Sequence, residues 1–250
     1  MHTNDSLLNT FDKTWWNAFN SCDVFAGEVN ATDTVQLMGS MMDMMMKDTV
    51  LADLYAEEEL KRVNRFIIEK TDVATAMVLT RLKPFYIMAA IMEIPDESGP
   101  YTEVMDIRLQ RIAFERKKKV VGLETNSEQA ASVGAMSLKE QAKMLLEFVD
   151  EGHKQGNEMK KLEDLYRSQH LDDMYHFAMT YSTPETPEKM MDALIDERNH
   201  RFFERLSEHL SMSSVFCAVG ALHLPGETGL INLLRASGYK VEPVNFNFGE

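Results

Sequence analysis

The C-terminal part of the chain constrains the fold most, because its apolar runs and turn residues alternate in a regular order. An apolar run at 214–220 (SVFCAVG) predicts a strand, 221–227 (ALHLPGE) has the composition of a turn, and 228–237 (TGLINLLRAS) has helical spacing. Gly238 is placed to end that helix, and a second apolar run at 239–244 (YKVEPV) predicts another strand. Two strands joined through a helix are most simply parallel, with a right-handed crossover. This segment therefore predicts an α/β protein with a C-terminal strand–helix–strand unit.

Two more short apolar runs predict buried strands earlier in the chain, VFAGE at 24–28 and VVGLE at 120–124. Apolar residues at helical spacing occupy most of the rest, over 4–20, 53–70, 75–92 (interrupted at Pro84), 102–116, 127–180 and 190–209. No stretch has the composition of a linker. We therefore expect one domain over residues 1–250, with a small central sheet and a large, mostly helical insertion between its strand-bearing ends.

The charge balance bears on the partners of the chain. The net charge is −14, from 40 acidic and 26 basic residues, so the surface repels phosphate backbones and we expect no nucleic-acid partner. No run approaches the roughly 20 apolar residues of a membrane helix, so we expect no membrane span in this chain. Its two cysteines, Cys22 and Cys217, do not form a disulfide framework; we expect buried small side chains, with one disulfide as the alternative.

Three polar residues share one placement relative to the predicted strands. Glu28 closes the first strand, Glu124 closes the second, and His223 follows the third within three residues. Ligands of open α/β sheets bind at the carboxyl ends of the strands, so these side chains converge if the strands are neighbours. Carboxylate and imidazole together suit Zn, Mn, Fe or Co rather than Ca. Spacing alone leaves the structural alternative open for each residue, a salt bridge or cap for the glutamates and a turn contact for the histidine.

The segment GALHLPGETGLINLLRASGYKVEPV resembles the C-terminal signature of the TraB/GumN family, which is related to the TIKI proteases and to the erythromycin-esterase/ChaN-like fold. Its G-x-x-H core runs from Gly220 to His223, and Pro225 and Gly226 follow. Four further segments match family motifs in the right order. They are CDVFAGEV, KPF, KKVVGLETNSEQ and DERNHRF, the last of which contains Arg198 and Asn199.

The resemblance implies a metal-dependent hydrolase, acting on peptide or protein substrates. Its divalent ion (Mn, Zn, Co or Fe) would be held by His2, His223 and a glutamate, with one of Glu28 and Glu124 as ligand and the other as general base. The resemblance also implies that Arg198 stabilises a developing oxyanion and that Asn199 anchors a loop. A helix-surface salt bridge is the plainer alternative for Arg198. A non-catalytic binding or regulatory protein that keeps the fold is the alternative for the whole chain.

The family carries a first G-x-x-H near its N-terminus, preceded by a strand, whereas this chain begins Met1-His2. We therefore expect that the chain is truncated and lacks one strand, the Gly-x of that motif and an export signal. The competing interpretation is a genuine start at which His2 has no role. The chain as given predicts a cytoplasmic protein, and a lost signal would make it an exported one, periplasmic or lipid-anchored.

Overall fold

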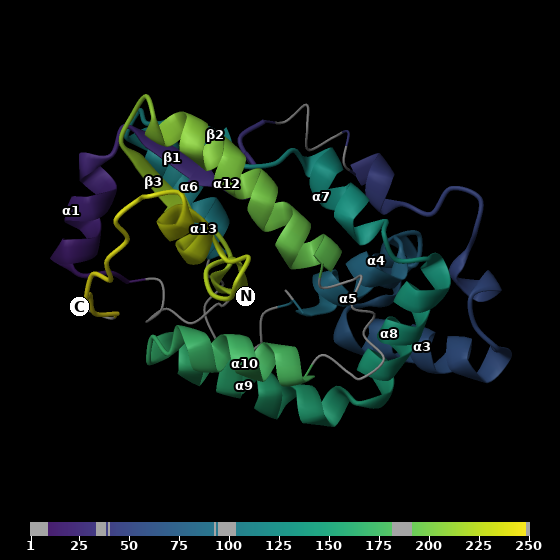
Figure 1. The fold of residues 1–250 in the computed structure, drawn as a ribbon. Coiled ribbons are helices and arrows are strands. Elements are labelled where there is room, and N and C mark those ends of the chain that lie inside the picture. Colours follow the sequence, from purple (N-terminus) through teal and green to yellow (C-terminus); the bar gives the residue numbers. More distant parts are fainter. Residues whose placement is uncertain are drawn as a thin grey trace.

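Three strands form one parallel sheet in the order β2-β1-β3 (Figure 1). The computed structural model from which the fold is taken describes residues 10–33, 39, 41–92, 94, 104–181 and 192–248. The strands are β1 (Val24–Gly27), β2 (Lys119–Gly122) and β3 (Val215–Ala218). Their register is level, so that Gly27 at the end of β1 lies opposite Gly122 and Ala218. The carboxyl ends of the three strands therefore meet at one edge of the sheet.

Helices cover both faces of this sheet, because side chains along each strand alternate between the faces and all of them except Lys119 are apolar. Phe25 and Phe216 pack with one pair of helices, and Ala26 and Cys217 pack with the other pair. The first pair is α1 (Lys13–Ser21) and α6 (Met105–Glu115), and the second is α12 (Glu197–Leu210) and α13 (Leu230–Ala236). The sheet is thus the middle of three layers.

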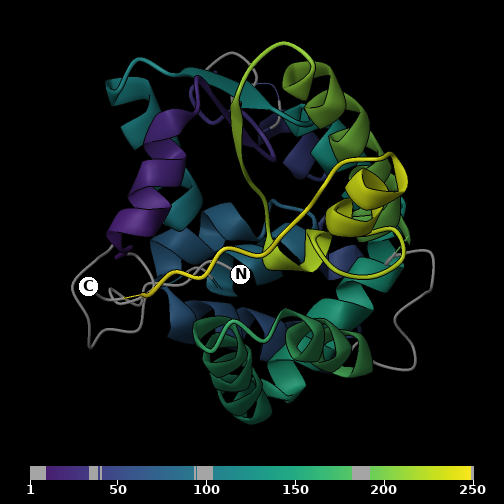
Figure 2. The ribbon, with the colours of Figure 1, turned by 60° about the vertical axis from the view of Figure 1, so that its left-hand side comes forward.

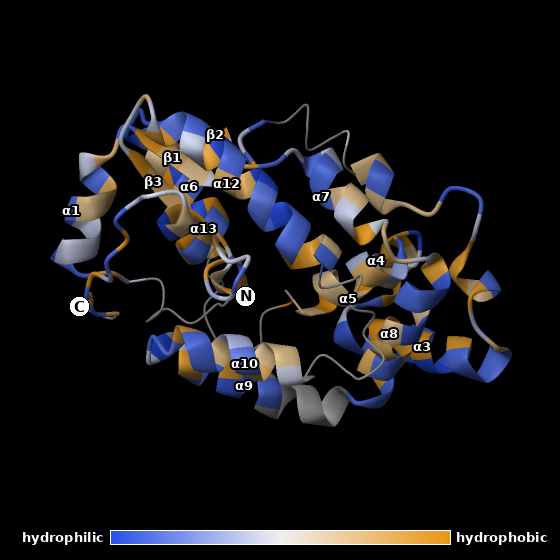
Figure 3. Ribbon diagram, in the orientation of Figure 1, coloured by the Kyte–Doolittle hydropathy of each residue, from blue (hydrophilic) through white to orange (hydrophobic). Residues whose placement is uncertain are grey.

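A second, helical part has its own core, formed by Val63, Ile67, Ile87 and Leu145. Figure 3 shows the hydrophobic residues of its helices gathered where α3, α5 and α8 face one another. Its elements are η1 (Leu51–Asp53), α3 (Glu57–Lys70), α4 (Val73–Leu79), α5 (Pro84–Met92), α7 (Asn126–Val133), α8 (Leu138–Asp150), α9 (Gly152–Arg167) and α10 (Leu171–Tyr181). The helices α9 and α10 lie side by side, and α10 reaches back to the turn that follows β3 (Figure 2).

The structure confirms an α/β fold with a large helical part, and it confirms the three predicted strands to within a few residues. It separates the predicted helix at 75–92 into α4 and α5, because Pro84 begins a new helix, where its missing N–H costs nothing. The predicted helix at 190–209 becomes a π-helical turn, η2 (Asp192–Asp196), followed by α12. Of the predicted helix at 4–20, the described part forms α1 from Lys13 onward.

The strand predicted at 239–244 is wrong, because these described residues pair with no strand. The helix α13 does end at the predicted glycine, since Gly238 has a φ of +89°. Beyond it the chain runs exposed along the surface, and Pro243 has no N–H to donate to a ladder. Only the first strand and the helix of the expected unit are therefore present. Both cysteines are free thiols, and none of the described helices is long and apolar enough to cross a membrane.

Candidate functional site

The three polar residues that the sequence placed at strand ends do meet. Glu28 directly follows β1, and the backbone ladder continues beyond the strands, with Glu124 donating its N–H to the Glu28 carbonyl at 2.8 Å. His223 closes the 3-10 turn η3 (Ala221–His223), which leaves β3 at the same edge of the sheet. Its Nε2 lies 3.8 Å from Oε1 of Glu28. The level register of the parallel strands is what brings these residues together.

Arg198, on the first turn of α12, lies between the two carboxylates. Its Nη2 donates to Oε2 of Glu28 and to Oε1 of Glu124, both at 2.6 Å, and its Nε donates to the same Glu124 oxygen at 2.9 Å. Its Nη1 donates to the Leu194 carbonyl at 3.0 Å. Arg198 is 7% exposed and Glu124 is 2% exposed. The arginine is therefore part of a buried ion-pair cluster, and with the described residues it forms no helix-surface salt bridge of the kind considered from the sequence.

The Glu124 carboxylate is fully engaged. Arg201 donates to its Oε2 at 3.2 Å, and Gln129 donates to its Oε1 at 3.3 Å, in addition to the bonds from Arg198. Sequence reasoning missed both of these partners. Arg201 could have been found, because it lies one helical turn from Arg198 and faces the same way. With both oxygens held by neighbours, Glu124 is placed to fix Arg198 in position.

Glu28 has a different environment, with one oxygen turned toward His223. Its Oε1 accepts the Gly220 N–H at 2.7 Å, and a Cβ on Gly220 would lie 3.0 Å from this oxygen and 3.6 Å from Cδ2 of His223. Only glycine fits between the two side chains without displacing them. Burial by itself raises the pKa of Glu28, but His223, Arg198 and the Gly220 N–H together hold that pKa below its usual value. Glu28 is therefore ionised at neutral pH.

His223 is buried and is held by Asn199, the residue that follows Arg198 on α12. The Asn199 Oδ1 lies 2.7 Å from Nδ1 of His223, and both residues are less than 5% exposed. Because an amide oxygen only accepts, Nδ1 carries the proton and Nε2 keeps its lone pair. The pKa of His223 is lowered to about 4, chiefly by burial; Glu28 opposes this shift and Arg198 adds to it. The imidazole is thus neutral at pH 7 and presents Nε2 toward Glu28.

These two side chains fit a divalent metal ion. A Zn-type ion binds nitrogen and oxygen ligands at about 2.0–2.2 Å, so one ion can bridge two donors up to roughly 4.2 Å apart. The separation of 3.8 Å between His223 Nε2 and Glu28 Oε1 lies within that reach. Asn199 makes the contact that an outer partner of a metal-binding histidine makes. Glu124, in contrast, accepts four hydrogen bonds from side chains, three of them on one oxygen.

Two donors do not complete a site by themselves. Among the described residues, no group of three or more His, Cys, Asp or Glu side chains is placed to hold a metal ion. His2 lies outside the described residues, so its role as a ligand stays a prediction.

The turn after His223 has a fixed backbone, with Pro225 buried and Gly226 in the left-handed region at a φ of +88°.

The fold and the site together define a three-layer α/β protein with a buried Glu–Arg–His cluster at the carboxyl edge of a parallel sheet. The chain belongs to the TraB/PrgY/gumN family, whose sequence model matches residues 1–243. This match confirms the family resemblance stated from the motifs. Comparisons with curated proteins and with solved structures gave no match.

Proposed function

We propose that this protein is a divalent-metal-dependent hydrolase that acts on peptide bonds. The observation that carries the proposal is the pair formed by His223 and Glu28. A neutral imidazole nitrogen with a free lone pair lies 3.8 Å from an ionised carboxylate oxygen, too far for a hydrogen bond and well placed for a shared ion. A third proposed ligand is His2. A divalent ion held in this way polarises a carbonyl group and lowers the pKa of a water molecule.

The remaining residues of the cluster have separate tasks in this proposal. Arg198 supplies fixed positive charge beside Glu28, in a buried setting where such charge offsets negative charge that develops on a substrate oxygen. Glu124 positions Arg198 through two hydrogen bonds, which is why we assign the ligand role to Glu28 and the positioning role to Glu124. Asn199 keeps the His223 tautomer that leaves Nε2 free.

One observation favours the second candidate, a non-catalytic binding or regulatory protein that keeps the fold. The charges of Glu28 and Glu124 are already balanced by two arginines, Arg198 and Arg201, within hydrogen-bonding distance. A buried cluster that is neutral without an ion can serve as a structural element of the fold alone. The two candidates differ in whether His223 is needed for chemistry or only for packing.

A peptidase assay with matched variants separates them. The purified protein is incubated with a mixed peptide library and, in turn, Mn²⁺, Zn²⁺ and Co²⁺, and the products are read by mass spectrometry. We expect metal-dependent cleavage that falls by about 10–100-fold in Asn199→Ala, the usual effect of losing an outer partner, and by more in His223→Gln and Glu28→Gln. His200→Gln is the control, because His200 is exposed on the same helix.

Each variant is first checked for native circular dichroism, so that lost activity is not mistaken for lost fold. Cleavage by His223→Gln at the wild-type rate would sink the proposed site. The absence of cleavage with all three ions, from a protein that is folded, would favour the binding protein.

A further inference from the structure

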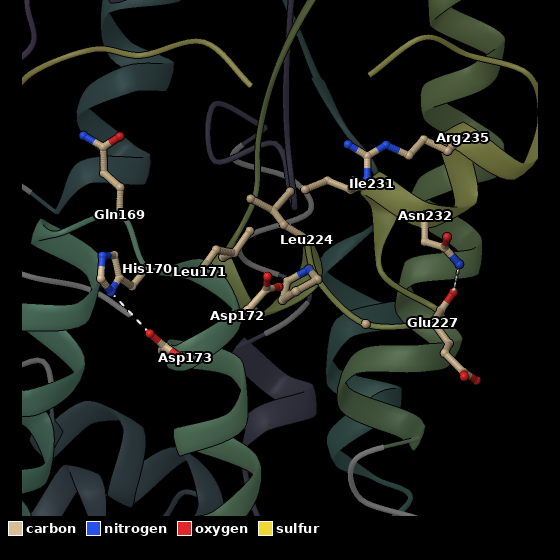
Figure 4. Close-up of a pocket in the computed structure, with 12 residues that line it drawn as sticks. Gln169, His170, Leu171, Asp172, Asp173, Leu224, Glu227, Ile231, Asn232 and Arg235 are labelled. Carbon is tan, nitrogen blue, oxygen red and sulfur yellow. Dashed lines mark hydrogen bonds and ion pairs between the residues drawn. The ribbon is translucent and has the colours of Figure 1, made fainter. Parts of the chain in front are cut away.

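A surface groove of about 870 Å³ lies beside the turn that carries His223 (Figure 4). Its walls are residues 169–173 at the start of α10, residues 224–227 of the turn, and one side of α13. Leu224 both lines the groove and directly follows His223, so the groove begins one residue from the proposed site. Its volume lies in the range of sites that bury a ligand of a few residues.

The floor of the groove is apolar. Leu171 comes from α10, Leu224 from the turn and Ile231 from α13, and Figure 4 shows their side chains together in the middle of the groove. All three side chains are only half-buried, so part of their apolar surface remains in contact with water. An apolar side chain of a ligand laid on this floor would remove their remaining exposed area from water, which favours binding.

The two walls carry opposite charge. The Asp172 carboxylate stands on the α10 wall, and within the described residues no hydrogen bond or ion pair engages it. Arg235 stands on the α13 wall and donates from Nη2 to the Val241 carbonyl at 3.1 Å. Asp173 is paired with His170 at 3.2 Å, at the outer end of the groove. Glu227 also lines the groove, but Figure 4 shows its carboxylate directed away from the floor, whereas the Asp172 carboxylate lies beside it.

The wall next to the site is fixed in shape. At its φ of +88° Gly226 takes a conformation that other residues rarely adopt, and a Cβ there would lie 3.0 Å from the hydroxyl oxygen of Tyr175 on α10. The turn and α10 are thus in close contact at this point, and Ile231 ties the turn to α13 by donating its N–H to the Leu224 carbonyl at 3.2 Å. The groove does not have to form when a ligand arrives.

We propose that this groove binds the part of an extended peptide substrate next to the bond that is cleaved, with an apolar residue on the floor and a neighbouring basic residue facing Asp172. The inference rests on the proposed function, because it takes the peptide to be a substrate of the site at His223, the residue directly before Leu224 of the groove. Charge complementarity selects a basic neighbour over an acidic one.

The test compares two labelled hexapeptides of the same length, one with a central Lys-Leu pair and one with a central Glu-Leu pair. Binding to the protein as purified is measured by fluorescence anisotropy, and the peptide is then recovered and its mass checked, so that binding and cleavage are read separately. Asp172→Lys is the test variant. Glu69→Lys is its matched control, because Glu69 is exposed on α3 away from the groove and the substitution changes the net charge equally.

We expect the Lys-Leu peptide to bind about tenfold more weakly to Asp172→Lys than to Glu69→Lys, and the Glu-Leu peptide to bind more tightly to Asp172→Lys. Ile231→Ser should weaken both peptides alike. This pattern without any change in peptide mass supports the groove while the hydrolase proposal fails. Equal binding of the two peptides, or equal effects of the two lysine substitutions, overturns the groove. Cleavage that shows no preference between the peptides also overturns it and leaves the hydrolase standing.

Discussion

Replacing Arg198 by methionine is the sharpest test of the buried ion-pair cluster. The arginine makes four hydrogen bonds, three of them to Glu28 and Glu124, and methionine keeps much of its volume while removing every one of them. The carboxylates of Glu28 and Glu124 would then stay close together without the positive charge of Arg198 between them. Removing one partner of a buried ion pair costs about 3–5 kcal/mol, because the remaining charge stays in a poorly solvated site.

The structure places the expected cost at the low end of that range. Glu124 keeps Arg201 at 3.2 Å and Gln129 at 3.3 Å, and Glu28 keeps the Gly220 N–H at 2.7 Å. We therefore expect the free energy of unfolding to fall by about 3 kcal/mol at pH 7. The exposed pair Arg111–Glu115 supplies the control, since both side chains are about half exposed. Arg111→Met should cost no more than about 0.5 kcal/mol.

The cost must also depend on pH. The pKa of Glu28 is lowered in the folded protein, so its contribution to stability is present above the unfolded pKa and is lost as the pH falls through the folded one. Losing Arg198 removes part of that contribution. The difference in the free energy of unfolding between wild type and variant should therefore be largest at pH 7 and should decrease as the pH falls below 4.5. Urea unfolding, followed by tryptophan fluorescence at pH 7 and pH 4, measures both values. The reasoning would be refuted if this difference in the free energy of unfolding were the same at both pH values. It would also be refuted if the loss at pH 7 were no larger than that caused by Arg111→Met.

Three further predictions follow from single contacts. Gly220→Ala should lower the melting temperature, at a cost of about 1–3 kcal/mol, because the new Cβ would lie 3.0 Å from a carboxylate oxygen; an unchanged melting temperature would contradict the close approach. Glu128→Gln should cost at most about 1 kcal/mol at pH 7 in urea unfolding, and less as the pH falls toward 2, because Arg205 holds the Glu128 pKa at about 2 and this contribution is lost as the pH falls from the unfolded pKa through that value; a cost that does not decrease toward pH 2 would count against the pair. Burial raises the pKa of Cys217 to about 12, so in a Cys22→Ser background its thiol should react with a disulfide reagent at pH 8 only after unfolding, and rapid labelling of the folded protein would contradict this.

The sheet was predictable from the sequence because its strands are buried on both faces. Such strands appear as short, continuous apolar runs, and here each run ends at or near a glycine with a polar residue within the next three positions. That pattern placed Glu28, Glu124 and His223 at strand ends. Their meeting then required only that the strands be parallel neighbours, which the register confirms.

Other features depend on partners that a local pattern does not contain. The alternation in 239–244 is typical of an edge strand, but whether such a segment pairs is decided by the sheet that it meets, and here it stays exposed. The engagement of Glu124 by Gln129 and Arg201 requires α7 and α12 to lie on either side of it. The family resemblance implied that Asn199 anchors a loop, but its contact with His223 was not contained in the local pattern, because the two residues lie 24 positions apart along the chain.

The most direct test of the proposed metal site is calorimetric titration of Mn²⁺, Zn²⁺ and Co²⁺ into chelator-treated protein. Wild type is compared with His223→Ala and with His200→Ala, whose histidine is exposed on α12. The proposed site predicts about one equivalent of at least one of these ions in wild type and in the His200 variant, and none in a folded His223 variant. Equal binding by all three proteins, or no binding by wild type, would contradict it.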